Sequence, residues 1–301
     1  MMDKNASFFE TIIPTDWKGK TLHQYLRQEL QLSRGRVRAL KQTDGIFLDQ
    51  KAVWVSAVLN GGEQLVLRFD SAEQNFAAEK IDLSIVYEDQ DIVVVNKPAG
   101  MVVHPVKKHQ SGTLANALKY HWQSNGENVS FHPLHRLDRL TSGLVLIAKN
   151  PWAHQQLDLQ IQSRSLHRLY LAICQGNPLK ESGRVEAPIK SYLETPRREI
   201  APDGQYALTR FRVLDHSAIA SLLVIKLYTG RTHQIRVHLS HSGNPLWGDP
   251  LYGLPDPLFP RPALHAVKLS FIHPRNKKPI CVKSDLPEDF KRLMEEKLDR
   301  K

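Results

Sequence analysis

The sequence HRLDRLTSG, residues His135–Gly143, runs directly into the apolar segment Leu144–Ala148, LVLIA. A short apolar run bounded by turn residues is typical of a buried strand. A strand fixes Asp138 in place while the Thr-Ser-Gly turn exposes it, so one carboxylate is held at the edge of a cleft. An isolated aspartate before such a turn is also common as an Asx-turn or capping group. The local pattern therefore allows both a structural and a catalytic interpretation of Asp138.

The segments around this stretch predict an α+β domain over residues 75–301. Alternating apolar residues predict strands at 81–85, 92–95, 166–173, 184–189, 207–214 and 221–228, and helical spacing predicts helices at 111–121, 151–161, 232–240 and 290–298. Pro151 is suited to the first turn of its helix. Because strands outnumber helices and several are joined by short turns, we expect a mixed, largely antiparallel sheet.

Residues 1–74 predict a small α/β domain with a basic helical face. Between Lys18 and Lys41 the sequence has seven basic residues and one acidic residue in a helix-turn-helix pattern. Ser33 can cap the second helix, which would carry Arg34, Arg38 and Lys41 on one side. Such a face fits a phosphate backbone, although a merely solvated charged face is the alternative interpretation. The polar and small residues 70–79 predict a linker.

The composition describes a globular protein with a polyanionic partner. The chain has 301 residues, 41% hydrophobic and 24% charged, and a net charge of +10. A positive field attracts phosphates without regard to sequence, but charge alone leaves membranes and acidic proteins open. No apolar stretch approaches 18 residues and the start lacks a signal-peptide core, so we expect no membrane association. Cys174 and Cys281 are far apart and in no CxxC pairing, so we expect reduced thiols in a cytoplasmic monomer.

Three segments in register resemble one enzyme family. His135–Gly143 resembles the HRLDxxTSG signature of the RluA-type pseudouridine synthases, and Asp91–Pro105 and Gly230–Gly253 resemble the segments before and after it. The chain departs from the pattern at Leu140, where many members carry an acidic residue, and at Arg168, where a lysine is more usual. The resemblance implies a pseudouridine synthase fold with Asp138 as the essential aspartate.

The N-terminal part resembles, more loosely, the small S-four RNA-binding domain of a ribosomal protein. The likeness lies in Leu32-Ser33-Arg34, in Gly45 and in the alternating run that ends at Gly61–Leu67. The family's Val-Asn-Gly turn reads Leu48-Asp49-Gln50 here. The resemblance implies an RNA partner, ribosomal RNA first and transfer RNA as the other candidate, and does not identify the uridine.

The implied reaction breaks the bond from ribose to nitrogen 1 of uracil and remakes it to carbon 5, which requires no redox cofactor and no metal. His233, His238 and His241 lie close in sequence, yet no carboxylate or cysteine pair completes a ligand pattern. The reaction does require an ionised carboxylate beside the sugar, to attack it or to remove a proton from it. The sequence leaves both routes open for Asp138.

The resemblance also assigns roles to four other residues. Arg231, in GRTHQIR, is the expected ion-pair partner of Asp138. Tyr170 is expected to stack on the uracil or to donate its hydroxyl near the departing base. A uridine in folded RNA must be flipped out to react, and Arg136 is expected to fill the gap that it leaves. Leu269 is expected to pack against the base.

Two other function classes fit parts of the sequence. A non-catalytic RNA-binding or ribosome-assembly factor would use the same basic surfaces, but it would have no need of Asp138, Tyr170 and Arg231 together. A serine hydrolase could use Ser142, but the nucleophile elbow GxSxG lacks its first glycine here. We therefore expect an RNA pseudouridine synthase.

Overall fold

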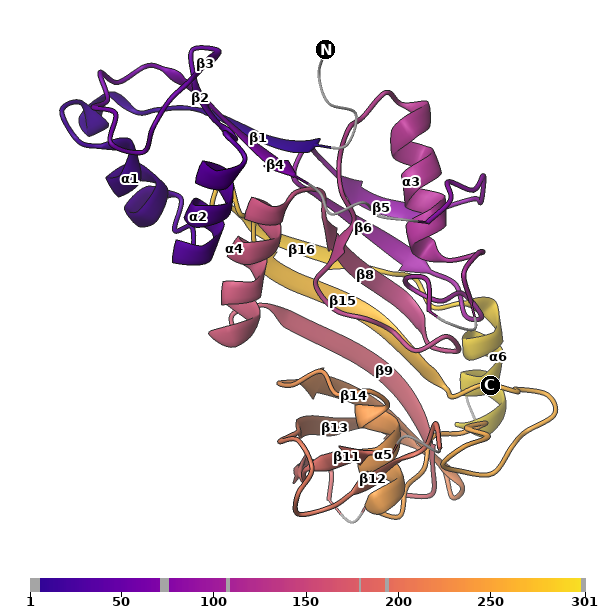
Figure 1. Ribbon diagram of the computed structural model, residues 1–301. Helices are drawn as coiled ribbons and strands as arrows, with labels where there is room; N and C mark the ends of the chain where they lie inside the picture. Colours follow the sequence, from indigo (N-terminus) through magenta and orange to yellow (C-terminus); the bar gives the residue numbers. More distant parts are fainter. Residues whose placement is uncertain (1–5, 71–75, 107–108, 179, 193–194, 299–301) are drawn as a thin grey trace.

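The computed structural model describes residues 6–70, 76–106, 109–178, 180–192 and 195–298, which form a small N-terminal unit against a large curved sheet (Figure 1). The expected domain boundary at residues 74 and 75 falls at a segment, 71–75, that lies outside the described residues. The N-terminal sheet has the order β1-β4-β2-β3, with β1 Ala6–Ile12, β2 Ile46–Leu48, β3 Lys51–Ala52 and β4 Gln64–Asp70. Its helical segments are η1 Thr15–Trp17, α1 Leu22–Gln24, the π turn η2 Tyr25–Glu29 and α2 Arg34–Gln42.

The second unit is built on a ten-stranded sheet of order β10-β13-β14-β9-β15-β8-β6-β5, with β16 on β15 and β7 on β8. The strands are β5 Ile85–Glu88, β6 Ile92–Lys97, β7 His132–Pro133, β8 Ser142–Ala148, β9 His167–Gln175, β10 Ser182–Glu186, β13 Leu208–His216, β14 Ala220–Leu227, β15 Leu264–Ile272 and β16 Pro279–Lys283. The pair β8 and β15 is parallel, and the other pairs described are antiparallel. The predicted mixed, largely antiparallel sheet is confirmed. A separate ribbon pairs β11 Ile189–Ser191 with β12 Arg198–Ile200.

The helices begin where side chains cap them. In α3, Leu114–Ser124, Thr113 forms a capping box with Asn116, and in α4, Pro151–Gln162, the Asn150 side chain accepts a hydrogen bond from the Ala153 amide. These caps satisfy amide groups that the first helical turn leaves free. The remaining helices are α5 Gln234–His241 and α6 Glu288–Lys297. Among the described residues, no helix combines the length and the hydropathy needed to cross a bilayer.

One predicted strand starts later than expected. The pattern placed it at 81–85, but regular pairing begins at Ile85, and the preceding residues contribute a single backbone bond from the Asn96 amide to the Ser84 carbonyl. A register shift between Ile85 and Tyr87 accompanies this irregular start. Apolar alternation reports which side chains face the core and does not reveal where a partner strand begins.

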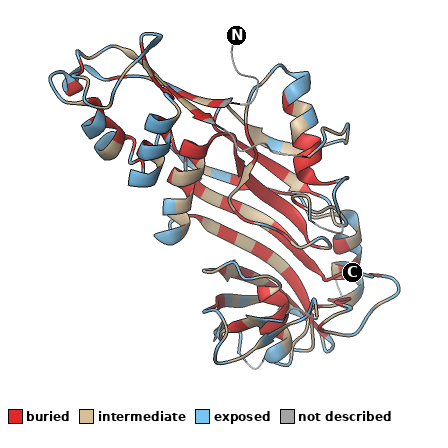
Figure 2. Ribbon diagram, viewed as in Figure 1, coloured by how far each residue is buried: buried red, intermediate tan, exposed pale blue. Residues whose placement is uncertain are grey.

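Glycine at position 143 lets the central strands approach each other. Its φ of 112° is unfavourable for any residue with a Cβ, and a Cβ there would lie 2.4 Å from the Ala266 carbonyl oxygen. Gly143 and Ala266 are Cα partners in the parallel pair of β8 and β15. The turn that carries Asp138 therefore ends at a close contact in the middle of the sheet, where most residues are buried (Figure 2).

The N-terminal unit shares a hydrophobic core with the large sheet through α4. Trp152 on α4 is 3% exposed, and its ring lies 4.2 Å, centroid to centroid, from that of Phe9 on β1. The Trp152 indole and the Gln156 amide both donate to the Leu30 carbonyl, at 3.2 Å and 3.0 Å. One cluster of buried residues contains members of both units. The N-terminal unit is therefore packed against the large domain and is no freely tethered module.

An ion pair reinforces the same contact. Arg275 donates two hydrogen bonds, of 2.6 Å and 2.8 Å, to the fully buried carboxylate of Asp91, and a third to the Glu10 carbonyl on β1. Its guanidinium also lies 4.5 Å from the Phe9 ring centroid. Bidentate geometry of this kind is needed to compensate a buried carboxylate for its lost hydration.

We predict that Trp152→Ala lowers the free energy of unfolding by about 3–5 kcal/mol, because a large buried aromatic leaves a cavity between the two units. Urea denaturation followed by circular dichroism measures the change. Trp54→Ala is the matched control: that indole is 67% exposed, so we expect a change within about 0.5 kcal/mol. Equal effects of the two substitutions would contradict a shared core.

Candidate active site

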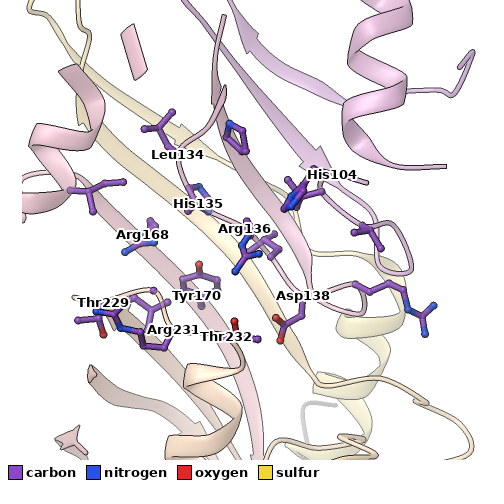
Figure 3. Close-up of a pocket in the computed structure, with 18 of the residues that line it drawn as sticks. His104, Leu134, His135, Arg136, Asp138, Arg168, Tyr170, Thr229, Arg231 and Thr232 are labelled. Atoms are coloured by element: carbon purple, nitrogen blue, oxygen red, sulfur yellow. The ribbon is translucent and has the colours of Figure 1, made fainter. Parts of the chain in front are cut away.

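A pocket of about 750 Å³ opens between the loop before β8, strand β9 and the segment before α5 (Figure 3). It brings together four of the residues expected in the site, namely Asp138, Tyr170, Arg136 and Arg231. Its other polar lining residues are His104, His135, Arg139, Asp158, Arg168, Arg198, Thr229 and Thr232. A smaller recess continues from the same residues toward His233, Arg236 and Leu264. The lining is strongly basic, which suits a phosphate-bearing ligand.

Asp138 lies in the turn between β7 and β8, with its side chain 24% exposed. Its carbonyl accepts a hydrogen bond from the Thr141 amide, which closes the turn. One carboxylate oxygen, Oδ2, is 3.2 Å from Nη1 of Arg236 on α5. A guanidinium in direct contact donates a charge-assisted hydrogen bond and fixes the orientation of this carboxylate.

Arg236 is itself held by a second carboxylate. Its Nε and Nη2 donate to the two oxygens of Asp249, at 2.7 Å and 2.8 Å, and Asp249 is fully buried. The amides of Leu251 and Tyr252 also donate to Asp249. Burial opposes the charged form of Arg236, but the two carboxylates outweigh burial and raise its pKa. The guanidinium therefore remains charged and in a fixed orientation, with Nη1 left for Asp138.

His233 completes the surroundings of the carboxylate. Its Nε2 lies 3.8 Å from Oδ2 of Asp138, and its Nδ1 is 2.9 Å from the Tyr252 hydroxyl. The residue adopts a left-handed conformation, with φ 58°, directly before α5. Burial lowers the pKa of His233 more than the nearby carboxylates raise it, so the imidazole is neutral near pH 7. The positive charge that faces Asp138 is thus that of Arg236.

Tyr170 lies on β9 in the floor of the pocket. It is 3% exposed, and its hydroxyl forms no hydrogen bond with any other residue in the described part of the chain. Burial raises the pKa of Tyr170, so the phenol stays protonated. A neutral hydroxyl without a partner is available to a ligand in this pocket.

The expected partnership between Arg231 and Asp138 is wrong in its choice of arginine. Arg231 is exposed at the rim of the pocket, where its Nε donates to the Tyr206 carbonyl at 3.2 Å. It precedes α5, whereas Arg236 lies within the helix and is 5% exposed. The two arginines are five residues apart in one motif, and only the start of the helix decides which of them faces inward. Arg136 is exposed and lines the pocket.

Leu269 does not line the pocket. It is 1% exposed and belongs to the cluster that α4 forms with β16 and the N-terminal unit. The apolar residue of this segment that lines the recess beside Asp138 and Tyr170 is Leu264. Leu264 pairs with Ala172 and Leu269 with Arg168, so the two leucines lie at different positions along the same pair of strands. Which of them reaches the recess depends on the segments that pack against β15, and the sequence does not show this.

Lys97 supports the turn of Asp138 from behind, a role that the sequence did not suggest. Its fully buried ammonium donates to the carbonyls of Pro98, Met101 and Arg139, at 2.9 Å, 2.8 Å and 3.4 Å. The Arg139 carbonyl also accepts from the Gly100 amide at 2.7 Å. Burial lowers the pKa of Lys97 to about 7, although the charge of Asp138 acts in the opposite direction. The segment after β6 and the turn before β8 are thereby tied together.

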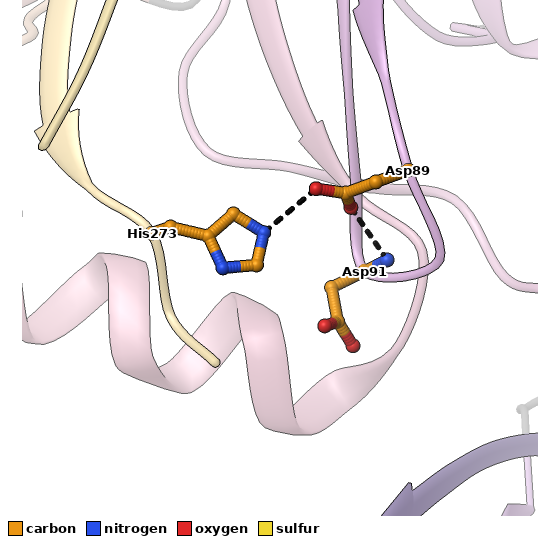
Figure 4. A group of neighbouring side chains, drawn as sticks. All are labelled: Asp89, Asp91 and His273. Carbon is orange, nitrogen blue, oxygen red and sulfur yellow. Dashed lines mark hydrogen bonds and ion pairs between the residues drawn. The ribbon is translucent and has the colours of Figure 1, made fainter. Parts of the chain in front are cut away.

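Asp89, Asp91 and His273 lie within reach of one ion, but protein groups already occupy their oxygens (Figure 4). Asp89 accepts bonds from His273, from the Tyr87 hydroxyl and from two amides. The Asp91 carboxylate accepts hydrogen bonds from Arg275 and Asn150. These contacts account for the cluster as part of the packing beneath the N-terminal unit.

We predict that Arg236→Lys lowers the rate of turnover at saturating RNA by about a hundredfold to a thousandfold. Lysine keeps one charge but cannot bind Asp249 at two points while it reaches Asp138. Arg231→Lys is the comparison, with a smaller loss expected because Arg231 does not contact the carboxylate. Single-turnover kinetics with a thermal melt of each variant test this, and a larger loss in the Arg231 variant would overturn the assignment.

Known proteins resemble this chain in both units. The family model for RNA pseudouridylate synthase matches residues 91–241, which include Asp138, Tyr170 and Arg236. The model described as the RluD ribosomal pseudouridine synthase N-terminal domain matches residues 9–65.

Two curated bacterial proteins are similar over almost the whole length. A protein of Bacillus subtilis (strain 168), named an uncharacterized RNA pseudouridine synthase, is 36% identical over 296 residues, 97% of this chain and 98% of that protein. The ribosomal large subunit pseudouridine synthase D of Pseudomonas aeruginosa is 38% identical over 295 residues, 92% of each. Among solved structures, that of human RNA Pseudouridylate Synthase Domain Containing 1 has a TM-score of 0.56 at 27% identity, covering 70% of this chain and 86% of that one.

Proposed function

Because this chain belongs to the RNA pseudouridine synthase family, we propose that it isomerises uridines of ribosomal RNA, with Asp138 as the catalytic carboxylate. The observation that carries the assignment is the contact of 3.2 Å between Asp138 and the buried Arg236 at the edge of a basic pocket. An aspartate that only closed a turn would not need a guanidinium fixed by a second buried carboxylate.

The reaction rearranges one nucleotide and leaves its composition unchanged. The bond between C1′ of the ribose and N1 of uracil breaks, and a bond between C1′ and C5 forms. The hydrogen on C5 is released as a proton, and N1 gains a proton. Asp138 can serve either as the nucleophile at C1′ or as the base that removes a proton from the sugar, and in both roles it must be ionised. Arg236 supports that ionised state in either route.

Tyr170 is proposed to contact the flipped uracil, and Arg136 is proposed to fill the gap that the flipped base leaves in the RNA. The buried phenol ring offers a stacking surface for uracil, and its unpartnered hydroxyl is available to the departing base. Arg136 is two residues from Asp138 and exposed at the pocket, so its planar cation is suited to stack in the gap left by the flipped base. Leu264 is proposed as the apolar wall beside the base.

The N-terminal unit is proposed to bind the same ribosomal RNA. The Ser33 side chain caps α2 by accepting from the Arg36 amide, and Arg34, Arg38 and Lys41 are all exposed on this helix. The likeness of residues 9–65 to the N-terminal domain of a ribosomal pseudouridine synthase supports ribosomal RNA over transfer RNA. The free cysteines, Cys281 exposed and Cys174 buried, fit a reducing compartment, and we propose a cytoplasmic monomer.

Asp138→Asn tests the catalytic role. The amide keeps the shape and loses the charge, so we expect release of tritium from carbon 5 of labelled uridine to fall by about a hundredfold to ten-thousandfold, with RNA affinity nearly unchanged. The matched control is Asp82→Asn, which removes an exposed carboxylate far from Asp138 in the sequence and should keep the parent rate. Release by the Asp138 variant near the parent rate would sink the assignment.

The basic face of α2 is tested by charge substitution, because deletion of residues 1–74 would expose the core around Trp152. If Arg34, Arg38 and Lys41 each contact a phosphate, changing all three to glutamine should flatten the slope of log affinity against log salt by about 2–3. The rate at saturating RNA should change much less. The same change at Lys180, Arg184 and Arg212, which are exposed near the opposite edge of the large sheet, is the control. Equal slopes for the two triple variants would contradict an RNA-binding face on α2.

A further inference from the structure

Arg168 on β9 is a buried cation without a partner. Three arginines are more than nine-tenths buried among the described residues, namely Arg168, Arg236 and Arg261. Arg236 is paired with Asp249, and Arg261 donates two bonds to Asp289, at 2.7 Å and 2.9 Å. Arg168 is 6% exposed, its Nε has no hydrogen-bond partner, and it forms no ion pair within the described ranges. An unpaired buried charge is strongly unfavourable, so its presence calls for a ligand.

The guanidinium lies in the pocket beside Tyr170 (Figure 3). Residues two apart on a strand share one face at a spacing of about 6.7 Å, so Arg168 and Tyr170 point to the same side of β9. Gly230 leaves the space that Arg168 occupies, because a Cβ at that position would lie 3.2 Å from Nη1. The site is therefore built around this side chain.

No carboxylate of the described residues forms an ion pair with Arg168. Burial raises the pKa of Tyr170 and, together with the charge of Arg168, lowers that of His135 to about 3, so both neighbours are neutral. Of the two carboxylates that line the pocket, Asp138 is paired with Arg236 and Asp158 accepts a bond from Gln162. An anionic ligand is the group that can compensate Arg168 here. In RNA the anionic group is the phosphodiester, whereas uracil is neutral.

We propose that Arg168 binds a backbone phosphate next to the flipped uridine and so fixes the position of the ribose relative to Asp138. The planar guanidinium can donate to two phosphate oxygens at once, which sets orientation as well as distance. Arg168 is thus a substrate-positioning residue, distinct from the base-filling role proposed for Arg136. The inference rests on the proposed function, since it takes RNA as the ligand.

The test combines protein variants with neutral RNA linkages. The probe is the shortest ribosomal RNA hairpin that the wild-type protein modifies, prepared with single methylphosphonates, one at a time, around the target uridine. We expect one linkage at which the neutral group weakens wild-type binding by about 10- to 100-fold. Arg168→Met should weaken binding of unmodified RNA to a similar extent. The methylphosphonate at that linkage should not weaken the binding of this variant any further. The slope of its log affinity against log salt should be flatter by about 0.7. Arg212→Met, at an exposed site outside the pocket, should bind and respond as the wild type does.

Two further variants keep the test decisive if Arg168→Met does not fold. Arg168→Lys keeps the charge, so the salt slope should stay the same. It should lose part of the binding affinity that depends on the charged phosphate at that linkage. Gly230→Ala crowds the guanidinium and should have the same effect without altering Arg168. Equal sensitivity of the wild type and the Arg168 variants at every linkage overturns the proposal.

Failure of the proposed substrate has a different signature. If the wild type modifies no ribosomal transcript, the ribosomal assignment fails. The same linkage scan is then made on a uridine-containing hairpin that the protein binds, so the role of Arg168 is still decided. Loss of turnover by an Arg168 variant with unchanged affinity and unchanged linkage sensitivity would also refute a phosphate contact.

Discussion

The guanidinium of Arg236 is fixed between two carboxylates, and the site depends on that arrangement. Asp249 is fully buried and takes two of its nitrogen donors, which leaves Nη1 at 3.2 Å from Asp138. Because an ion pair inside a protein is favourable only when its hydrogen bonds are satisfied, the amides that bind Asp249 are part of the same support. The orientation of the Asp138 carboxylate is therefore set by buried groups of α5 and of the segment after it.

A second support holds the backbone beside Asp138. Lys97 binds the Arg139 carbonyl and two carbonyls of the segment after β6, while Gly143 allows β8 and β15 to meet directly after the turn. The turn of Asp138 is thus held at the Arg139 carbonyl and, directly after the turn, at Gly143. Its side chain still reaches solvent through the pocket, and this combination of rigidity and access is what a reaction at the ribose requires.

The N-terminal unit is joined to this framework more closely than a tether would be. Trp152 and Gln156 on α4 bind its backbone, and Arg275 links it to the buried Asp91. α4 also contributes Ile161 to the wall of the pocket. RNA bound on α2 would therefore be held at a fixed distance and angle from Asp138.

The sequence by itself determined most of the elements and placed Asp138 in the turn before β8. Local signals are sufficient for these features: Asn150 and Pro151 start α4, Ser33 starts α2, and alternation marks the strands. The motif around Asp138 further predicted that Tyr170 and Arg136 would share its pocket, as they do.

Only the tertiary structure decided which of two residues close in sequence points into the site. Arg231 and Arg236 lie in one motif, but the left-handed conformation at His233 begins α5 between them and turns Arg236 inward. Leu264 and Leu269 share a strand, yet Leu264 lines the recess while Leu269 packs in the core with α4 and β16. The missing partner of Arg168 was equally invisible, because a counter-ion is supplied by whichever segments fold beside it. Direction, register and pairing are properties of packing across long separations, and no local pattern encodes them.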